Sequence, residues 1–301
     1  MLDPIVSLTG LFVGFVVGLT GMGGGALMTP ILVLLFGIEP LAAVSSDIVA
    51  AVVMKPVGGA VHWRHGTVHR QLVVWLMLGS IPSAFCGVLL VRSFGSGSGL
   101  QSAIRDALGV ALLVVVAGLL IRPILQRNRH ADPQVPLKVL RLPTLLIGVV
   151  GGLVVGITSV GSGSLMIVML LMLYPRMRLS ELVGTDLVQA IPLVMSAALA
   201  HIIFGHFHFA LTASILLGSI PGVFIGARFS ARGPDFVIRP ALMVVLTASG
   251  LKLLGTNTMI VGVVAGLMTV CGIAYSVTTA RARTVRLAAA VSNAALSSGG
   301  E

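Results

Sequence analysis

Charge is the first property that this sequence lacks. Only 9% of its 301 residues are charged and 56% are hydrophobic, whereas a soluble domain carries about 25% charged residues. Such a chain has too little polar surface to cover itself in water. Apolar runs of roughly 20 residues recur along most of the chain, which is the length of a membrane-spanning helix and not of a barrel strand. The composition therefore predicts an all-α, polytopic membrane protein.

Several motifs are also missing, and each absence excludes a class of protein. No G-x-x-x-x-G-K-[ST] loop occurs, which excludes an ATP-driven pump. No serine lies in a G-x-S-x-G motif and no acidic cluster could hold a metal, so we expect neither an enzyme, nor a cofactor, nor a metal site. Cys86 and Cys271 have neither metal-like spacing nor a disulfide context. The net charge of +10 lies in short loops, where it fixes membrane orientation and does not indicate nucleic-acid binding.

An internal repeat organises the chain. The stretch GFVVGLTGMGGGALM (14–28) returns as GLVVGITSVGSGSLM (152–166), and GSIP recurs at 79–82 and 218–221. Residues 46–88 share 14 identities with 185–227 at a constant offset of 139, including histidine, aspartate and proline, which apolar composition alone does not align. We therefore expect two equivalent halves, 1–122 and 142–255, joined by a cytoplasmic linker, 123–141.

Each half is predicted to hold one glycine-broken segment and three membrane-spanning helices. The broken segments cover 5–36 and 143–174. The expected helices are about 40–61, 72–92 and 105–121 in the first half, and about 179–203, 209–229 and 237–254 in the second. Residues 256–301 add one further membrane helix and a cytoplasmic tail. Pro82 and Pro221, in the GSIP motifs, are expected to kink their helices.

The broken segments are too long for one simple crossing. About 32 residues of straight helix span about 48 Å, against a hydrocarbon core of about 30 Å. Each is either a long tilted helix or a re-entrant hairpin. A single crossing divides the loop Lys and Arg residues about 8 against 10 between the two faces, whereas two hairpins divide them 15 against 3. The positive-inside rule favours hairpins, with the N-terminus outside and the C-terminus in the cytoplasm of an inner (plasma) membrane protein.

Three crossings after each hairpin make the two halves inverted, as in many secondary transporters, where the site lies near the midplane at the breaks. Irregular backbone is tolerated there only if it is buried or lines a cavity. The second half-helices begin near Ala26 and Ser164, and their N-termini attract anions. The alternative is that the glycines only permit close helix packing. The substrate-binding positions predicted in the breaks are Thr20, Gly21, Gly23, Gly24, Gly25, Ala26, Thr158, Ser159, Gly161, Ser162, Gly163 and Ser164.

Polar residues inside apolar segments supply the remaining candidates. Lys55 is the one basic residue deep in such a segment; it either faces an anionic substrate, or snorkels or pairs with a carboxylate. Asp47 and Asp186 are equivalent, and either cap helix N-termini, orient the hairpin tips or couple transport to protons. Gln189 is a candidate second donor to the anion, as are the hydroxyls of Ser46 and Thr185.

The four symmetric histidines lie at predicted segment ends and are interpreted as interfacial loop residues. They are His62, His69, His201 and His208.

The paired motifs GLTGMGGGALMTPIL and GITSVGSGSLM, with SSDIVAAV and GTDLVQAIP, resemble the TauE/SafE sulfite exporter family of membrane permeases from about residue 10 to 255. The resemblance implies transport of a sulfur-containing anion such as sulfite, thiosulfate or an organosulfonate like sulfoacetate. The second break departs from a pure glycine run by using serines, which bears on the choice of substrate.

These observations favour a secondary transporter working by alternating access, and an anion channel of the same architecture is the alternative. Export has a physical rationale, because an anion leaving an inside-negative cell gains about 2.3 kcal/mol per charge per 100 mV. The expected partners are the small anion and the lipid bilayer. A homo-oligomer is compatible with the sequence, and the last segment packs either on the core or at a subunit interface.

Overall fold

A computed structural model describes residues 3–20, 24–64, 66–93, 97–127, 139–175, 177–204, 208–230 and 235–272. All regular secondary structure within these ranges is helical, as the composition predicts. The helices of the first half are α1 (Pro4–Thr20), α2 (Gly25–Leu34), α3 (Pro40–Arg64), α4 (Arg70–Ser93) and α5 (Ser98–Arg127). Those of the second half are α6 (Arg141–Thr158), α7 (Leu165–Leu173), α8 (Leu179–Phe204), α9 (Phe209–Ser230) and α10 (Asp235–Leu253). A further apolar helix, Thr258–Gly272, follows α10.

Both glycine-rich segments are broken where the sequence predicts. The chain leaves the helix between α1 and α2 and again between α6 and α7. Within the described residues, five helices are long and apolar enough to cross a membrane, and α6 is one of them, whereas α2 and α7 are too short. The re-entrant course of each broken pair, the number of crossings and the orientation of the termini stay predictions. α5 is longer than expected, and most of the expected linker, 128–138, lies outside the described residues.

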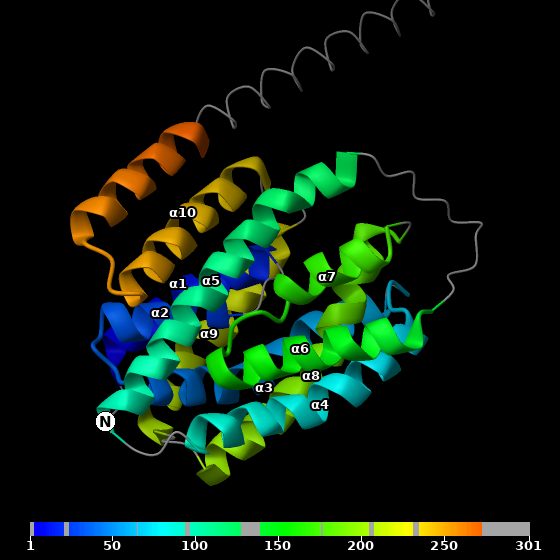
Figure 1. Cartoon of the computed structure of the whole chain (residues 1–301), viewed down its shortest axis with the longest axis horizontal. Coiled ribbons are helices and arrows are strands. Elements are labelled where there is room, and N and C mark those ends of the chain that lie inside the picture. The colour runs from blue at the N-terminus through cyan, green and yellow to red at the C-terminus, as the bar shows by residue number, and fades with distance from the viewer. Residues whose placement is uncertain are drawn as a thin grey trace, which may run out of the picture.

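The helices pack reciprocally across the two halves. α1 packs along α9 and α6 packs along α4, so each broken segment lies against the other half. The equivalent helices α3 and α8 contact each other, as do α5 and α10, which lie side by side in Figure 1. In each half, the helix before the break therefore packs on a helix of the other half. The inversion of the halves across a membrane stays a prediction.

Small residues bring the paired helices together. A Cβ built on Gly14 of α1 would lie 2.8 Å from the Cα of Ser219 in α9, and one on Gly152 of α6 would lie 2.7 Å from the Cα of Ser80 in α4. These two contacts are the same contact in the two halves. Backbones approach this closely in membranes where side chains are small. Close packing is therefore one use of these two glycines.

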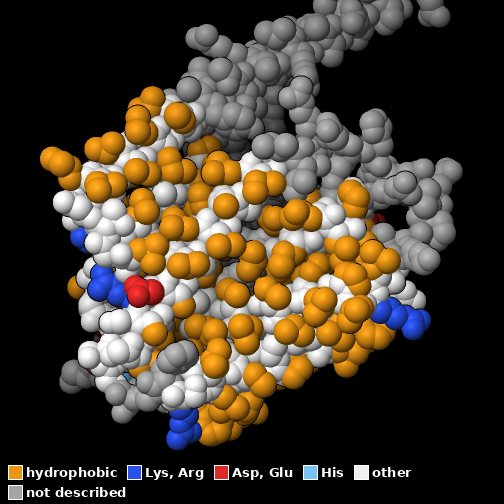
Figure 2. Space-filling model, in the orientation of Figure 1, with side chains coloured by type: hydrophobic (Ala, Val, Ile, Leu, Met, Phe, Trp, Pro, Cys, Tyr) orange, Lys and Arg blue, Asp and Glu red, His pale blue; other side chains and the backbone are white. Residues whose placement is uncertain are grey.

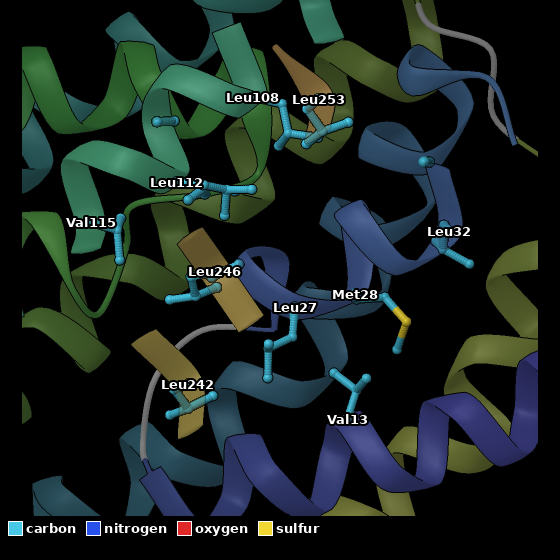
Figure 3. Close-up of a cluster of buried hydrophobic side chains, with 14 of the residues drawn as sticks. Val13, Leu27, Met28, Leu32, Leu108, Leu112, Val115, Leu242, Leu246 and Leu253 are labelled. Carbon is cyan, nitrogen blue, oxygen red and sulfur yellow. The ribbon is translucent and has the colours of Figure 1, made fainter. Parts of the chain in front are cut away.

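A hydrophobic cluster joins α1, α2, α5 and α10. Figure 3 shows Val13, Leu27 and Met28 near Leu242 and Leu246, with Leu108 and Leu112 beyond them. Many other large apolar side chains are exposed, and Figure 2 shows hydrophobic side chains across the visible face with Lys and Arg near its edges. An exposed apolar surface with a charged rim matches a bilayer as solvent. The chain is a multi-pass membrane protein.

Candidate functional site

The second break, residues 159–164, is the centre of the site. Ser159 follows α6 in the left-handed region (φ 60°), and Gly161 and Gly163 have φ values of 116° and 95°. Glycine adopts positive φ values without steric strain, so Gly161 and Gly163 let the chain turn between the two helices. A Cβ on Gly25, the first residue of α2, would collide with the backbone of Ser159. The end of the first break therefore contacts the start of the second.

Asp47 of α3 connects the two broken segments. Its Oδ2 accepts a hydrogen bond from Thr29 Oγ1 of α2 at 3.0 Å and another from Ser159 Oγ at 2.6 Å. Its Oδ1 faces Gly24, immediately before α2. The bond from Ser159 has the short length of a charge-assisted hydrogen bond, and the bond from Thr29 has an ordinary length. Asp47 thus fixes the first segment against the second break.

Lys55 lies two turns further along α3 and is buried. Its Nζ donates to Ser162 Oγ in the second break. Both Asp186 and Asp47 interact with it electrostatically. The predicted alternative of a surface-snorkelling lysine is therefore wrong, because the Lys55 side chain is buried inside the protein and bonded to Ser162.

Asp186 of α8 approaches the second break from the other side. Its Oδ1 accepts from Gln189 Nε2 at 3.0 Å, and the backbone of Gly163 lies beside it. Its Oδ2 is buried and has no hydrogen-bond partner among the described residues. Gln189 is held in turn by Ser80 Oγ of α4, which donates to Gln189 Oε1 at 3.2 Å. Along the second break, Ser159 thus contacts Asp47 and Ser162 contacts Lys55. The backbone of Gly163 lies beside Asp186.

The other predicted positions divide into four groups. Thr158 Oγ1 accepts from the amide of Val160 and Thr185 Oγ1 accepts from the amide of His69, so both hydroxyls also support the local backbone. Ser46 Oγ is buried and has no partner within the described part of the chain. Gly24, Gly25, Ala26, Gly161 and Ser164 are buried around the breaks. Gly21, Gly23 and the side chain of Thr20 lie outside the described residues.

The interpretation of the aspartates as helix caps is wrong. α3 begins at Pro40 and α8 at Leu179, so Asp47 and Asp186 lie about two turns inside their helices. An N-cap stands at the helix start, where amide groups are unpaired. Both carboxylates point instead at the second break. Orientation of the broken segments and proton coupling are the roles that stay open for them.

The structure contradicts the interpretation of His201 as an interfacial loop residue. It lies in the last turn of α8 and is fully buried. Its Nε2 is 2.9 Å from the carbonyl oxygen of Gly156, and its Nδ1 is 2.8 Å from Ser45 Oγ of α3. A carbonyl only accepts, so Nε2 carries a proton. His201 thereby holds the end of α6 three residues before Ser159.

One signal in the sequence could have pointed to His201. The position lies at an apolar segment's end and follows Ala-Leu-Ala without a Gly or Pro break, so the helix could have been extended through it. His208, by contrast, is exposed just before α9 as expected. The side chain of His62 lies outside the described residues.

This arrangement places one cationic group and several hydrogen-bond donors at the second break. Lys55 supplies the positive charge, and the serines of the second break and Gln189 supply donors around it. No group of three or more metal-ligating side chains occurs among the residues that the structure describes. A buried, dry setting strengthens such polar interactions relative to water.

Known proteins provide three comparisons. A family model described as sulfite exporter TauE/SafE matches residues 6–253. The probable membrane transporter protein YjnA of Bacillus subtilis (strain 168) is 42% identical over 256 residues, which cover 83% of this chain and 98% of that protein. A second probable membrane transporter protein of that strain, YdhB, is 25% identical over 252 residues, covering 83% and 99%. No solved structure matches the chain significantly.

Proposed function

Because this chain belongs to the sulfite exporter TauE/SafE family and is a membrane transporter, we propose that it exports a small sulfur-containing anion such as sulfite or an organosulfonate. The anion binds inside the membrane, near its midplane, between the two broken segments. Lys55 is its counter-ion, and Ser159, Ser162 and Gln189 donate hydrogen bonds to it. The chemistry is binding and release, with no bond made or broken.

One observation carries this proposal: Lys55 is buried at the second break beside Ser162 and two carboxylates. A buried ammonium group is costly unless anionic or acceptor groups surround it, and an ionisable residue inside a membrane segment is a candidate functional residue. Lys55 is also without an equivalent, since Val194 occupies its place in the other half. A substrate-binding group used once per transport cycle does not need a symmetric partner.

The reciprocal packing supports alternating access. Each broken segment packs on the opposite half, so a rocking motion of one half moves both breaks relative to α3 and α8. Asp47 and Lys55 contact the second break directly and would transmit this motion. Such a carrier saturates with substrate and catalyses counterflow, whereas an anion channel does neither.

Thermal unfolding of the purified protein tests the binding site. The panel contains sulfite, thiosulfate, sulfoacetate, methanesulfonate, taurine, sulfate and chloride, and a selective rise in Tm with one sulfur anion is expected. Lys55→Met keeps a long side chain but removes the charge. Because hydrogen bonds to charged groups contribute about 1.5–3 kcal/mol, the variant should weaken the Kd by roughly ten- to a hundredfold.

The matched control is Lys252→Met, since Lys252 is exposed near the end of α10 and donates to Thr258. It should respond to the anion as the unmodified protein does. If no anion raises the Tm, or if both lysine variants respond equally, the assignment of the site to Lys55 is wrong. Counterflow in proteoliposomes with the selected anion then separates a carrier from a channel.

A further inference from the structure

The anion-binding groups of the second break are already engaged by the protein's own carboxylates. Ser159 Oγ donates to Asp47, the backbone of Gly163 lies beside Asp186, and Lys55 interacts with both aspartates. A substrate anion and the two carboxylates therefore compete for one set of donors. With all three groups ionised, Asp47, Lys55 and Asp186 together carry one net negative charge, which disfavours a second anion.

The two aspartates are not held equally. Asp47 Oδ2 accepts from two hydroxyls, Thr29 at 3.0 Å and Ser159 at 2.6 Å. Asp186 has its Oδ1 bonded to Gln189, but its Oδ2 is fully buried and unpartnered within the described residues. An ionised carboxylate accepts hydrogen bonds only, whereas a protonated one has an O–H group that donates. The unpartnered Oδ2 of Asp186 can carry that proton, whereas Oδ2 of Asp47 already accepts from two hydroxyls.

We propose that Asp186 takes up a proton when the anion binds, so that the protein moves one proton together with each anion. This inference rests on the proposed function, since it concerns the same site. A proton from water adds to Asp186 Oδ2, and no other covalent bond changes. The neutral acid releases its hold on Lys55 and the second break, and its new O–H group donates to the anion. On the far side, loss of the anion returns the proton to water.

The groups around Asp186 fit this assignment. From α3, Lys55 faces it directly and Asp47 faces the same lysine. α4 contributes the hydroxyl of Ser80 through Gln189, and α7 contributes Met166, whose sulfur contacts Gln189 Nε2. His201, on the same helix, is about 22 Å further along the axis and is bonded to Ser45 and Gly156. Asp186 is thus a titratable group at the site with a buried oxygen that has no partner within the described part of the chain.

The coupling changes what drives export. A monoanion that leaves alone is pushed outward by an inside-negative potential. Accompanied by one proton, the same anion is electroneutral cargo, so its flux follows the anion and proton gradients and not the potential. This difference can be measured directly in proteoliposomes.

The experiment follows methanesulfonate, a monoanion throughout the working pH range, with thiosulfate as a second probe and an internal pH dye. Sulfite is avoided because it binds protons itself. For the unmodified protein, flux should respond to an imposed pH difference, bring one proton per methanesulfonate and ignore an imposed potassium–valinomycin potential. In Asp186→Asn the proton signal and the pH response should be abolished, while counterflow continues and net flux becomes dependent on the potential. Asp186→Glu, which can still titrate, should restore proton movement.

Asp47→Asn is the matched control at the equivalent position. It should lower counterflow and net flux together, because the bonds to Thr29 and Ser159 weaken, but proton movement per anion should stay unchanged. Proton coupling is overturned if the unmodified protein moves either probe without protons, or if Asp186→Asn still moves them. The assignment to Asp186 is overturned if Asp47→Asn is the uncoupled variant. If neither probe nor any panel anion binds or moves, the proposed function fails and this inference fails with it.

Discussion

The equivalent helices α3 and α8 have the same place in the two halves but carry different polar residues. Both begin after a broken segment, carry an aspartate about two turns from the start, and contact each other. Yet α3 has Ala50 and Lys55 where α8 has Gln189 and Val194. Asp47 bridges two segments, whereas Asp186 keeps one oxygen unpaired. The repeat therefore supplies the scaffold twice, while the binding chemistry is assembled once from complementary parts of the two halves.

The largest loss of stability is expected from substitutions at the close helix contacts that both halves contain. Gly14→Val and Gly152→Val place side chains against the backbones of Ser219 and Ser80, where α1 meets α9 and α6 meets α4. Overpacking of this kind costs about 1–3 kcal/mol and occasionally more, and here rigid backbone must move. The Tm measured in detergent should fall by similar amounts in the two variants. Gly262→Val, with nothing within 4 Å, is the control.

An unequal result would break the comparison between the halves. If Gly152→Val unfolds the protein and Gly14→Val does not, the two helix pairs are not equivalent in energy, whatever their geometry. If Gly262→Val is as damaging as the other two, the loss reflects valine in an apolar helix and not close packing.

The scaffold was predictable because it follows from pattern. Apolar length predicts helices, glycine runs predict the two breaks, and the constant offset predicts which helices are equivalent. Helix ends were less accurate, as at α5, where Ser98–Arg127 replaces the expected 105–121. Amphipathic turns at both ends extend that helix beyond the apolar run, so hydropathy alone underestimates it.

The site was predictable only as a set of residue types. Lys55, Asp47, Asp186 and Gln189 stand out because polar groups are rare in apolar segments. Their partners depend on how distant segments pack, so the bond from Ser159 to Asp47, 112 residues away, has no local signal. For the same reason a loop was expected at His201, whose partners are Ser45 and Gly156.

The next largest loss of stability is expected from removing the hydrogen bonds of His201. His201 joins Ser45 of α3 to the end of α6, but the residue equivalent to Ser45 is Gly184, which has no hydroxyl. His201→Leu leaves the carbonyl of Gly156 without this donor, which should cost about 1–3 kcal/mol. His201→Gln, with an amide donor of similar reach, should recover part of that loss in thermal unfolding.

The same variants should separate positioning from general stability. Because His201 holds α6 just before Ser159, counterflow with the selected anion should show a raised KM in His201→Leu and a smaller rise in His201→Gln. His208→Gln, at an exposed position before α9, is the control and should change neither quantity. Equal behaviour of the leucine and glutamine variants would show that the hydrogen bonds of His201 do not position the break.

The smallest expected change in the free energy of unfolding comes from serines at two equivalent positions. Because the residue type is the same, the two halves can be compared directly. Ser80 Oγ donates to Gln189 Oε1, whereas Ser219 Oγ is buried without a partner among the described residues. Ser80→Ala should lower the free energy of unfolding by about 1 kcal/mol. Ser219→Ala removes an unpaired polar group and should be neutral or slightly stabilising. Equal losses in chemical denaturation would mean that Ser219 also has a hydrogen-bond partner.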